Sequence, residues 1–253
     1  MRPNRVRELW RQGKPAIGSL LTLHSPLMAE VMGHVGFDWL GADLQHSETN
    51  LDGIQGMFQA VSNTPAMPFT RVAGNDSILI QRVLDLGAYG IIVPYVQTAE
   101  EAEAAVRAGK YPPRGVRSWG PIRGVLYGGA DYFDHANDET VLLMMLETRQ
   151  AVENARAILS VPGVDGCFIG PNDLGITYGE RPEGGVSGGV EEAIQEILAA
   201  AQATGTVAGI QTFGAEEVIR RADQGFRFIG LSSDVRLAAG AARRELATVR
   251  QQT

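Results

Sequence analysis

The segment Val141–Gly179, VLLMMLETRQAVENARAILSVPGVDGCFIGPNDLGITYG, contains two successive strand–helix units. Two short apolar runs within it, Val141–Leu146 and Gly166–Ile169, predict strands. A carboxylate follows each run, Glu147 in the first unit and Asp173 in the second. The carboxyl ends of neighbouring parallel strands meet at one edge of a sheet. The segment therefore predicts two anionic side chains held side by side over a parallel sheet.

The rest of the chain repeats this alternation of short apolar runs and helical segments. The expected strands are Ala16–Leu21, Phe37–Ala42, Met67–Thr70, Gly90–Val93, Val141–Leu146, Gly166–Ile169, Val207–Ile210 and Phe228–Gly230. Uninterrupted apolar runs are typical of parallel strands that are buried on both faces. Eight such units in 253 residues fit a (β/α)8 barrel, which typically has about 250 residues.

We therefore expect an α/β fold, a (β/α)8 TIM barrel formed as a single domain over residues 1–253, with an N-terminal helix before the first strand. A doubly wound open sheet is the alternative, but no G-x-G-x-x-G motif follows the first strand. Residues 110–140 form a long insertion before the fifth strand, which predicts either a subunit interface or a surface that reaches another chain's pocket. The glycine-rich segment Glu180–Gly189 follows the sixth strand and predicts a mobile lid.

The composition limits the classes of partner. The formal net charge is −7 at pH 7 and the pI is about 5.2, which argues against nucleic acid and anionic membranes as partners. Cys167 is the single cysteine, and the N-terminus has no apolar signal core. No apolar run approaches the roughly 20 residues that a membrane span needs. We expect a soluble cytoplasmic protein that acts on small molecules.

Glu147 and Asp173 are the best candidates for metal ligands. Two carboxylates with water suit Mg²⁺ or Mn²⁺, which prefer oxygen ligands and keep positions open for a substrate. A salt bridge from Glu147 to a nearby arginine is the alternative. Gly170-Pro171 lets backbone approach a ligand closely, and Asn172 and Asp173 then present amide N–H groups at a helix start, which could bind a substrate carboxylate.

Other polar residues follow the second and third predicted strands. His46 lies three residues after Asp43 and suits proton transfer near neutral pH. Arg71 would face negative charge that develops in the barrel mouth. The chain has only two lysines, and neither follows a strand, which argues against Schiff-base chemistry. A metal would then have to stabilise any carbanion.

Several motifs resemble those of one enzyme family. In order they are GFDWLGADLQH, TRVAGND, LDLGAYGIIVPYVQTAEEAEAAV, YPPRGVRSWGP, LETRQAVEN and VDGCFIGPNDLGITYG. Together they resemble the metal-dependent pyruvate aldolases, which include the 4-hydroxy-2-oxoheptanedioate and 2-dehydro-3-deoxyglucarate aldolases, with macrophomate synthase and the citrate lyase β subunit as relatives. The resemblance spans nearly the whole chain.

The resemblance implies a (β/α)8 barrel, usually a homohexamer in which the last helix is exchanged between subunits, acting in aromatic or sugar acid catabolism. It implies Glu147 and Asp173 as ligands of Mg²⁺, Mn²⁺ or Co²⁺, and pyruvate bound with the help of backbone at Gly170–Asp173. Arg71 would stabilise the enolate and His46 would be the base.

The resemblance also maps an acidic partner of the base to Asp85. That residue lies at the far end of a predicted helix, so it could act only through a folded-back or neighbouring segment. Asp43 is closer to His46 in sequence.

Three residues depart from the family pattern. The family often has Glu before the catalytic histidine, Gln two residues before the metal-binding glutamate, and Trp before the Asn-Asp of the third-strand loop. This chain has Gln45, Met145 and Gly74 at these positions. Gln45 and Met145 would alter the hydrogen bonding of the base and of the substrate, so they affect the identity of the substrate more than the reaction.

The sequence thus predicts a divalent-metal-dependent class II aldolase, a carbon–carbon lyase. It would reversibly cleave a 4-hydroxy-2-oxo acid to pyruvate, or a related 2-oxo acid, and an aldehyde. One alternative uses the same enolate for decarboxylation–addition or acyl-CoA cleavage, with the Arg114–Arg123 loop as the candidate CoA entrance. The other is a catalytically silent barrel that serves as a binding or assembly subunit.

Overall fold

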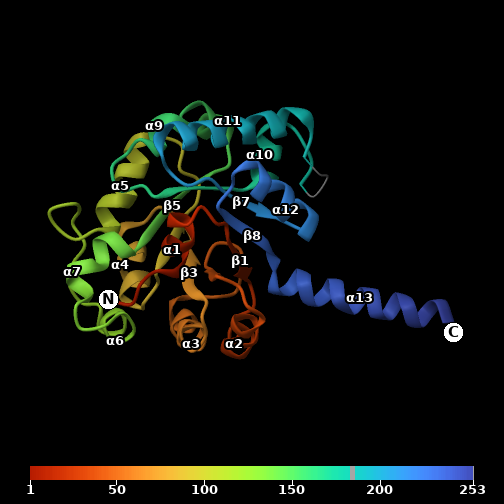
Figure 1. Ribbon diagram of the computed structural model, residues 1–253, viewed down its shortest axis with the longest axis horizontal. Coiled ribbons are helices and arrows are strands. Elements are labelled where there is room, and N and C mark those ends of the chain that lie inside the picture. The colour runs from red at the N-terminus through yellow and green to blue at the C-terminus, as the bar shows by residue number, and fades with distance from the viewer. Residues whose placement is uncertain (183–185, 253) are drawn as a thin grey trace.

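A closed barrel of eight parallel strands forms the centre of the chain. The computed structural model describes residues 1–182 and 186–252. Its strands pair in sequence order from β1 to β8, and β8 pairs with β1, which confirms the expected barrel (Figure 1). The strands are β1 (Ala16–Leu21), β2 (Trp39–Asp43), β3 (Met67–Arg71), β4 (Gly90–Val93), β5 (Val141–Leu146), β6 (Gly166–Ile169), β7 (Gly209–Thr212) and β8 (Phe228–Ser233).

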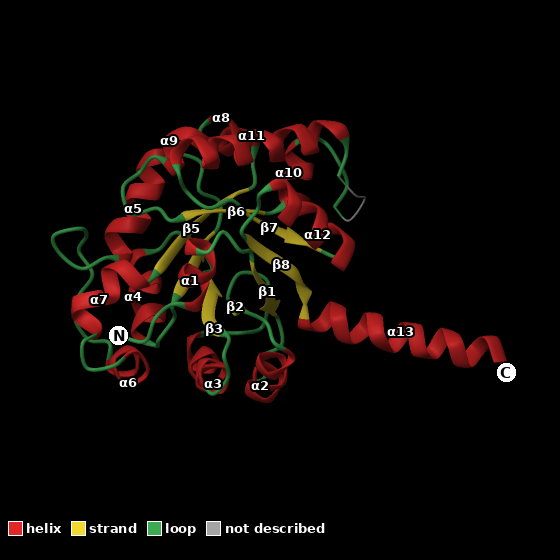
Figure 2. Ribbon diagram, viewed as in Figure 1, coloured by secondary structure: helices red, strands yellow, loops and turns green. Residues whose placement is uncertain are grey.

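Helices surround the barrel, as Figure 2 shows. They are α1 (Arg5–Arg11), α2 (Pro26–Val35), α3 (Leu51–Ser62), α4 (Ser77–Asp85), α5 (Ala99–Gly109), α6 (Ile122–Gly128), α7 (Tyr132–Glu139), α8 (Arg149–Glu153), α9 (Ala155–Leu159), α10 (Pro171–Thr177), α11 (Gly188–Thr204), α12 (Ala215–Gln224) and α13 (Asp234–Gln252). Side chains cap several of them: Thr98 and Glu101 form a capping box at α5, and Asn4 caps the expected N-terminal helix.

Several strands extend further than their apolar runs. The second strand ends at Asp43 and the third at Arg71, one residue beyond the expected ends. The seventh strand runs to Thr212 and the eighth to Ser233. These last residues are polar because the carboxyl ends of barrel strands open into a solvent-accessible mouth. Hydropathy therefore ends these four strands before the polar residues of the mouth, whereas it gives the ends of β1, β4, β5 and β6 correctly.

Aromatic rings fill the barrel below this mouth. Trp39 stacks on Phe228 with ring centroids 4.2 Å apart, and Phe69 and Phe168 pack against the same pair. Gly18 makes room for the indole, since a Cβ there would lie 2.0 Å from the ring of Trp39. The dense layer gives the mouth a rigid floor.

The insertion between α5 and β5 packs at the amino ends of the strands. It contains α6 and α7. Buried Lys110 holds the two ends of the insertion together, because its ammonium donates hydrogen bonds to the carbonyls of Asn137 and Thr140, both 2.8 Å away, just before β5 starts. Burial lowers the pKa of Lys110 to about 8. The insertion therefore lies at the end of this barrel opposite to the mouth.

The last helix, α13, is the element that stands apart from the barrel. It begins directly after β8 and extends away from the other helices (Figure 1). No helix in the described ranges is long and apolar enough to cross a membrane. The expected lid, Glu180–Gly189, includes residues 183–185, which lie outside the described residues.

Candidate active site

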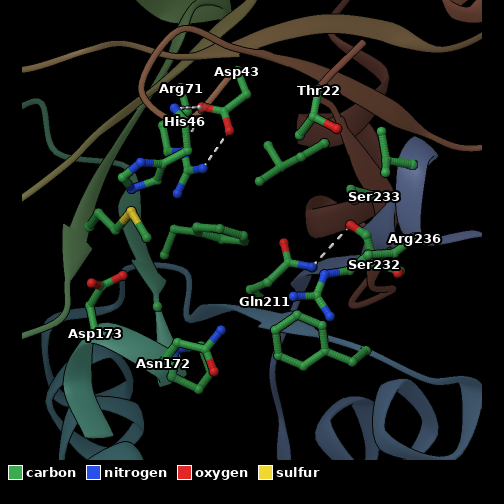
Figure 3. Close-up of a pocket in the computed structure, with 17 residues that line it drawn as sticks. Thr22, Asp43, His46, Arg71, Asn172, Asp173, Gln211, Ser232, Ser233 and Arg236 are labelled. Carbon is green, nitrogen blue, oxygen red and sulfur yellow. Dashed lines mark hydrogen bonds and ion pairs between the residues drawn. The ribbon is translucent and has the colours of Figure 1, made fainter. Parts of the chain in front are cut away.

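A cavity of about 380 Å³ opens at the carboxyl ends of the strands (Figure 3). It brings together most of the candidates from the sequence: Asp43, His46, Arg71, Met145, Gly170, Pro171, Asn172 and Asp173. It also has lining residues that the sequence did not single out: Leu20, Thr22, Phe168, Gln211, Phe213, Ser232, Ser233, Val235 and Arg236. Concave sites with a few convergent polar groups above an apolar floor are typical of small-molecule binding.

Glu147 lies buried beside this cavity, at the end of β5. Its side chain accepts a hydrogen bond from the backbone N–H of Tyr95, with 3.0 Å between N and Oε1. The other oxygen, Oε2, is buried without a hydrogen-bond donor. Within the described part of the chain Glu147 forms no salt bridge with an arginine, so the structure does not support that alternative role there.

The environment of Glu147 opposes its negative charge. Burial and the neighbouring Asp173 carboxylate raise its pKa to about 7, against the opposing effects of the Tyr95 N–H and of Arg71. An unpaired buried oxygen next to a second carboxylate is a strained arrangement for a metal-free carboxylate. The strain would be relieved by a cation between the two groups.

The residues at this position fit a divalent metal ion. Gly170 leaves the space open, since a Cβ there would lie 2.6 Å from Glu147 Oε2 and 2.6 Å from Met145 Cε. Among the described residues, no group of three or more His, Cys, Asp and Glu side chains lies close enough to hold a metal. Water and substrate oxygens would complete the coordination, as is common for Mg²⁺.

Asp43 and Arg71 form a buried ion pair at the ends of β2 and β3. Arg71 Nε lies 2.9 Å from Asp43 Oδ1, and Nη2 lies 2.5 Å from Oδ2. Neighbouring parallel strands bring them together, since Asp43 and Arg71 are paired in register. A guanidinium has five N–H groups, so Arg71 keeps donors for a ligand in the cavity while Asp43 fixes its plane.

Asp43 also shapes the loop that carries His46. Its Oδ1 accepts hydrogen bonds from the backbone N–H groups of Gln45, at 3.0 Å, and His46, at 3.3 Å. His46 is exposed at the edge of the cavity. Asp43 therefore supports the backbone of His46, and its carboxylate hydrogen-bonds to that backbone and not to the imidazole.

Gln45 and Asp85 lie outside this cavity. Gln45 borders a separate hollow with Tyr95, and its Oε1 is buried without a partner. Asp85 ends α4 and receives a hydrogen bond from Arg117 of the insertion at 2.8 Å. Since α4 ends at the amino side of β4, Asp85 lies at the opposite end of its own barrel from His46.

The insertion's arginines do not line the cavity. Arg117 is buried between Asp85 and Tyr132, Arg123 donates to the carbonyl of Leu86, and Arg114 pairs with Asp138. All three are held at the amino end of the barrel. The expected CoA entrance is therefore not beside the mouth of this chain.

The residues that were not anticipated come from β1, β6, β7 and β8, from the positions just after β1 and β7, and from the start of α13. The rule that found Asp43 and Arg71 selects a polar residue at the carboxyl end of a barrel strand. With the full length of β8 it would have found Ser233, and with the full length of β7 it would have led to Thr212, next to Gln211. Arg236 carries no such signal, because it lies inside a helix whose direction relative to the barrel only the structure gives.

Comparisons with known proteins agree with this geometry. A family model described as HpcH/HpaI aldolase/citrate lyase matches residues 17–241. A hydroxypyruvate/pyruvate aldolase of Rhizorhabdus wittichii is 38% identical over 252 residues, which cover 98% of this chain and 99% of the relative. A 4-hydroxy-2-oxo-heptane-1,7-dioate aldolase of Klebsiella pneumoniae is 38% identical over 245 residues, which cover 93% of this chain and 90% of the relative.

A solved structure extends the agreement to three dimensions. The crystal structure of an HpcH/HpaI aldolase/citrate lyase family protein from Burkholderia cenocepacia superposes with a TM-score of 0.91 at 30% sequence identity. The superposition covers 98% of this chain and 99% of that protein.

Proposed function

This chain belongs to the HpcH/HpaI aldolase/citrate lyase family, and on this premise we propose that its barrel mouth is the active site of a metal-dependent aldolase. The reaction is the reversible cleavage of a 4-hydroxy-2-oxo acid into pyruvate, or a related 2-oxo acid, and an aldehyde. The names of the relatives support this reaction. One observation on this chain supports the same reaction most directly. Asp43, His46, Arg71 and Asp173 line one cavity, and Glu147 is buried at its edge.

Glu147 and Asp173 would hold the divalent metal, Mg²⁺ or Mn²⁺. The donorless Oε2 of Glu147 and the missing Cβ of Gly170 support this assignment. When bound, the metal would supply Lewis-acid polarisation of the 2-keto oxygen.

Arg71 would bind the developing negative charge of the enolate oxygen. The bidentate contact with Asp43 fixes the guanidinium before the substrate arrives, so little reorganisation is needed during reaction. The Gly170–Asp173 turn would bind the substrate carboxylate through backbone N–H donors at the start of α10, which begins at Pro171.

His46 would act as the base in the direction of cleavage. Its imidazole, directly or through a water molecule, would take the proton from the 4-hydroxyl group. The C3–C4 bond then breaks, its electron pair moves onto C3 to give the enolate, and the aldehyde forms at C4. Protonation of C3 completes pyruvate.

A homo-oligomer is proposed as the working form, with a hexamer as the expectation. His46 is exposed in the single chain, and Asp85 lies at the far end of its own barrel, so the supporting carboxylate would have to come from a neighbouring subunit. Exposed apolar side chains on α2 support such contacts, with Leu27 at 70%, Val31 at 51% and Val35 at 66% exposure.

Exchange of the methyl protons of pyruvate in D2O tests the reaction without choosing an aldehyde. We expect the methyl proton NMR signal to decay with enzyme and Mg²⁺, and to persist when EDTA is added. Glu147→Gln and Asp173→Asn should each slow exchange by about 100-fold or more, as loss of one electrostatic contributor does. Glu153→Gln, an exposed carboxylate of α8, is the matched control.

The same assay can reject the proposal. Full exchange in either ligand variant, with folding verified by circular dichroism, would remove the metal pair from the reaction. Absence of exchange and of Mn²⁺ binding in the wild-type protein would instead support the catalytically silent barrel.

A further inference from the structure

A residue in the left-handed backbone conformation lies beside the candidate metal site. Tyr95 follows β4 and Pro94, and its φ is 56°. In the described part of the chain, Ser232 is the other non-glycine residue with a positive φ. Such residues are uncommon, and they tend to occur where function requires a particular backbone geometry. The aldolase chemistry proposed above gives Tyr95 no role.

This conformation brings two successive backbone N–H groups to the end of β5. The N–H of Tyr95 donates to Oε1 of Glu147, with 3.0 Å between N and O. The next N–H, that of Val96, donates to the carbonyl of Met145 at 3.3 Å. Left-handed residues in turns allow neighbouring N–H groups to converge on one region. The backbone at Tyr95 therefore delivers a hydrogen-bond donor to the buried carboxylate.

The loop that carries this donor is bound to the segment after Glu147. Gln97 Oε1 accepts a hydrogen bond from the hydroxyl of Thr148 at 3.1 Å. The carbonyl of Gln97 accepts another from the side-chain amide of Asn154 at 2.8 Å. These contacts and the one from Val96 hold the β4–α5 loop against the residues around Glu147. The tyrosine side chain is 50% exposed, so the backbone contacts determine where the N–H lies.

The two oxygens of Glu147 have different surroundings. Oε1 is occupied by the Tyr95 N–H, whereas Oε2 is buried without a hydrogen-bond donor. Oε2 faces Gly170, because a Cβ on that glycine would lie 2.6 Å from it. Gly170 precedes α10, the helix that carries Asp173. The oxygen without a donor is therefore directed at the segment of the second carboxylate.

We propose that Tyr95 is a positioning residue whose left-handed backbone holds Oε1 of Glu147 and leaves Oε2 alone to bind the metal. The inference rests on the proposed function, because it needs Glu147 and Asp173 to be the metal ligands. The hydrogen bond orients the carboxylate before the metal arrives, so less reorganisation is needed on binding. The phenol lies outside the lining of the cavity, which leaves the role to the backbone.

An amide-to-ester replacement tests the role of this N–H group directly. Nonsense suppression with 4-hydroxyphenyllactate, the hydroxy-acid analogue of tyrosine, removes the N–H at position 95 and keeps the side chain. We expect calorimetry to show Mn²⁺ binding that is about 10-fold weaker or more, as for other hydrogen bonds to metal ligands. The same replacement at Tyr132 removes a hydrogen bond to the carbonyl of Gly129, at the opposite end of the barrel. It should keep the wild-type Mn²⁺ affinity.

Two side-chain replacements test the left-handed conformation and keep the N–H. Tyr95→Gly adopts a positive φ readily, so its Mn²⁺ affinity should stay within about threefold of the wild-type value. Tyr95→Val introduces a β-branched side chain, which strongly disfavours this conformation. The backbone should then relax and the N–H should move away from Glu147, which weakens Mn²⁺ binding about 10-fold.

Three outcomes would overturn the proposal. The first is an ester protein with the wild-type Mn²⁺ affinity. The second is a Tyr95→Val protein that loses stability to urea but binds Mn²⁺ as the wild type does, because the contact would then serve the fold only. The third is an equal loss of Mn²⁺ affinity in Tyr95→Gly and Tyr95→Val, which would assign the effect to the phenol.

Failure of the aldolase reaction gives a different result. Calorimetry of Mn²⁺ needs no substrate, so it decides the role of Tyr95 even if the protein exchanges no pyruvate protons. Pyruvate exchange in a wild-type protein whose Mn²⁺ affinity does not depend on the Tyr95 N–H would reject this inference and keep the proposed function. A wild-type protein that binds no Mn²⁺ would reject the metal pair and the inference together.

Discussion

At the scale of single residues, Glu147 is the group whose ionisation should be most visible in stability. Its pKa rises from about 4.5 in an unfolded chain to about 7 in the folded protein. Between these values the folded state binds more protons than the unfolded state, so this group makes the metal-free protein less stable as pH rises from 4.5 to 7. At about 1.4 kcal/mol per pKa unit, the loss reaches roughly 3 kcal/mol above pH 7.

Glu147→Gln should therefore stabilise the chelator-treated protein above pH 7 and have little effect near pH 4.5. Urea unfolding of both proteins between pH 4.5 and 8.5 measures the difference, and Glu153→Gln should give a difference that does not vary with pH. Adding Mn²⁺ at pH 8 should reverse the order, because only the ionised glutamate binds the metal well. A stability difference that stays constant over this pH range would contradict the pKa shift.

The residue scale also shows what the sequence reveals about a site. Asp43, Arg71 and Asp173 could be predicted because they follow apolar runs, and the order of strands in a barrel then decides that they meet. The local partners could not be predicted in this way. Nothing in the sequence indicates that Asp43 holds Arg71 and the backbone of His46, or that the N–H of Tyr95 is directed at Glu147.

At the scale of elements, the two short helices α8 and α10, which follow or carry the candidate metal ligands, contact each other. Arg149, in the first turn of α8, donates a hydrogen bond from Nε to the carbonyl of Thr177 at 2.7 Å. Its guanidinium lies 4.0 Å above the ring of Tyr178, at the end of α10. Because Glu147 precedes α8 and Asp173 lies in α10, this contact links the two segments that carry the carboxylates.

Arg149→Ala should weaken Mn²⁺ binding about 10-fold, in line with losses at supporting residues of other metal sites. Calorimetry on the chelator-treated protein measures the change directly. Arg156→Ala, an exposed arginine of the next helix, should bind Mn²⁺ as the wild type does. Arg149→Lys keeps the charge but not the planar stack, so it should restore affinity only in part. Equal Mn²⁺ affinities for wild type and Arg149→Ala would show that the segments with Glu147 and Asp173 keep their positions without this contact.

Elements were easier to predict from this sequence than their ends. Apolar periodicity identified all eight strands, but it ended the last two before Thr212 and Ser233, where the polar side chains of the mouth begin. It also predicted one helix after Glu147, whereas the structure has two that meet at Asn154. Such ends depend on tertiary contacts, which hydropathy does not contain.

At the scale of the whole molecule, α13 extends away from the barrel and from the other helices (Figure 1). On α13, Leu246 and Val249 are 48% and 56% exposed and three residues apart, so they share one face of the helix. Exposed apolar groups on a projecting helix fit the proposed contact with another copy, and closed symmetric oligomers are the common result of such contacts. The sequence predicted the helix, but its projection away from the barrel required the structure.

The double variant Leu246→Glu/Val249→Glu should therefore lower the molar mass in solution, because two charges would have to be buried at the subunit contact. Light scattering coupled to size-exclusion chromatography measures the mass at several protein concentrations. Thr248→Glu adds a charge at an exposed polar position of the same helix and should keep the wild-type mass. The circular dichroism spectrum should not change, since these side chains are exposed in the single chain. A wild-type protein that is already monomeric at micromolar concentration would reject the proposed oligomer. It would also reject the proposal that Asp85 of a neighbouring subunit supports His46.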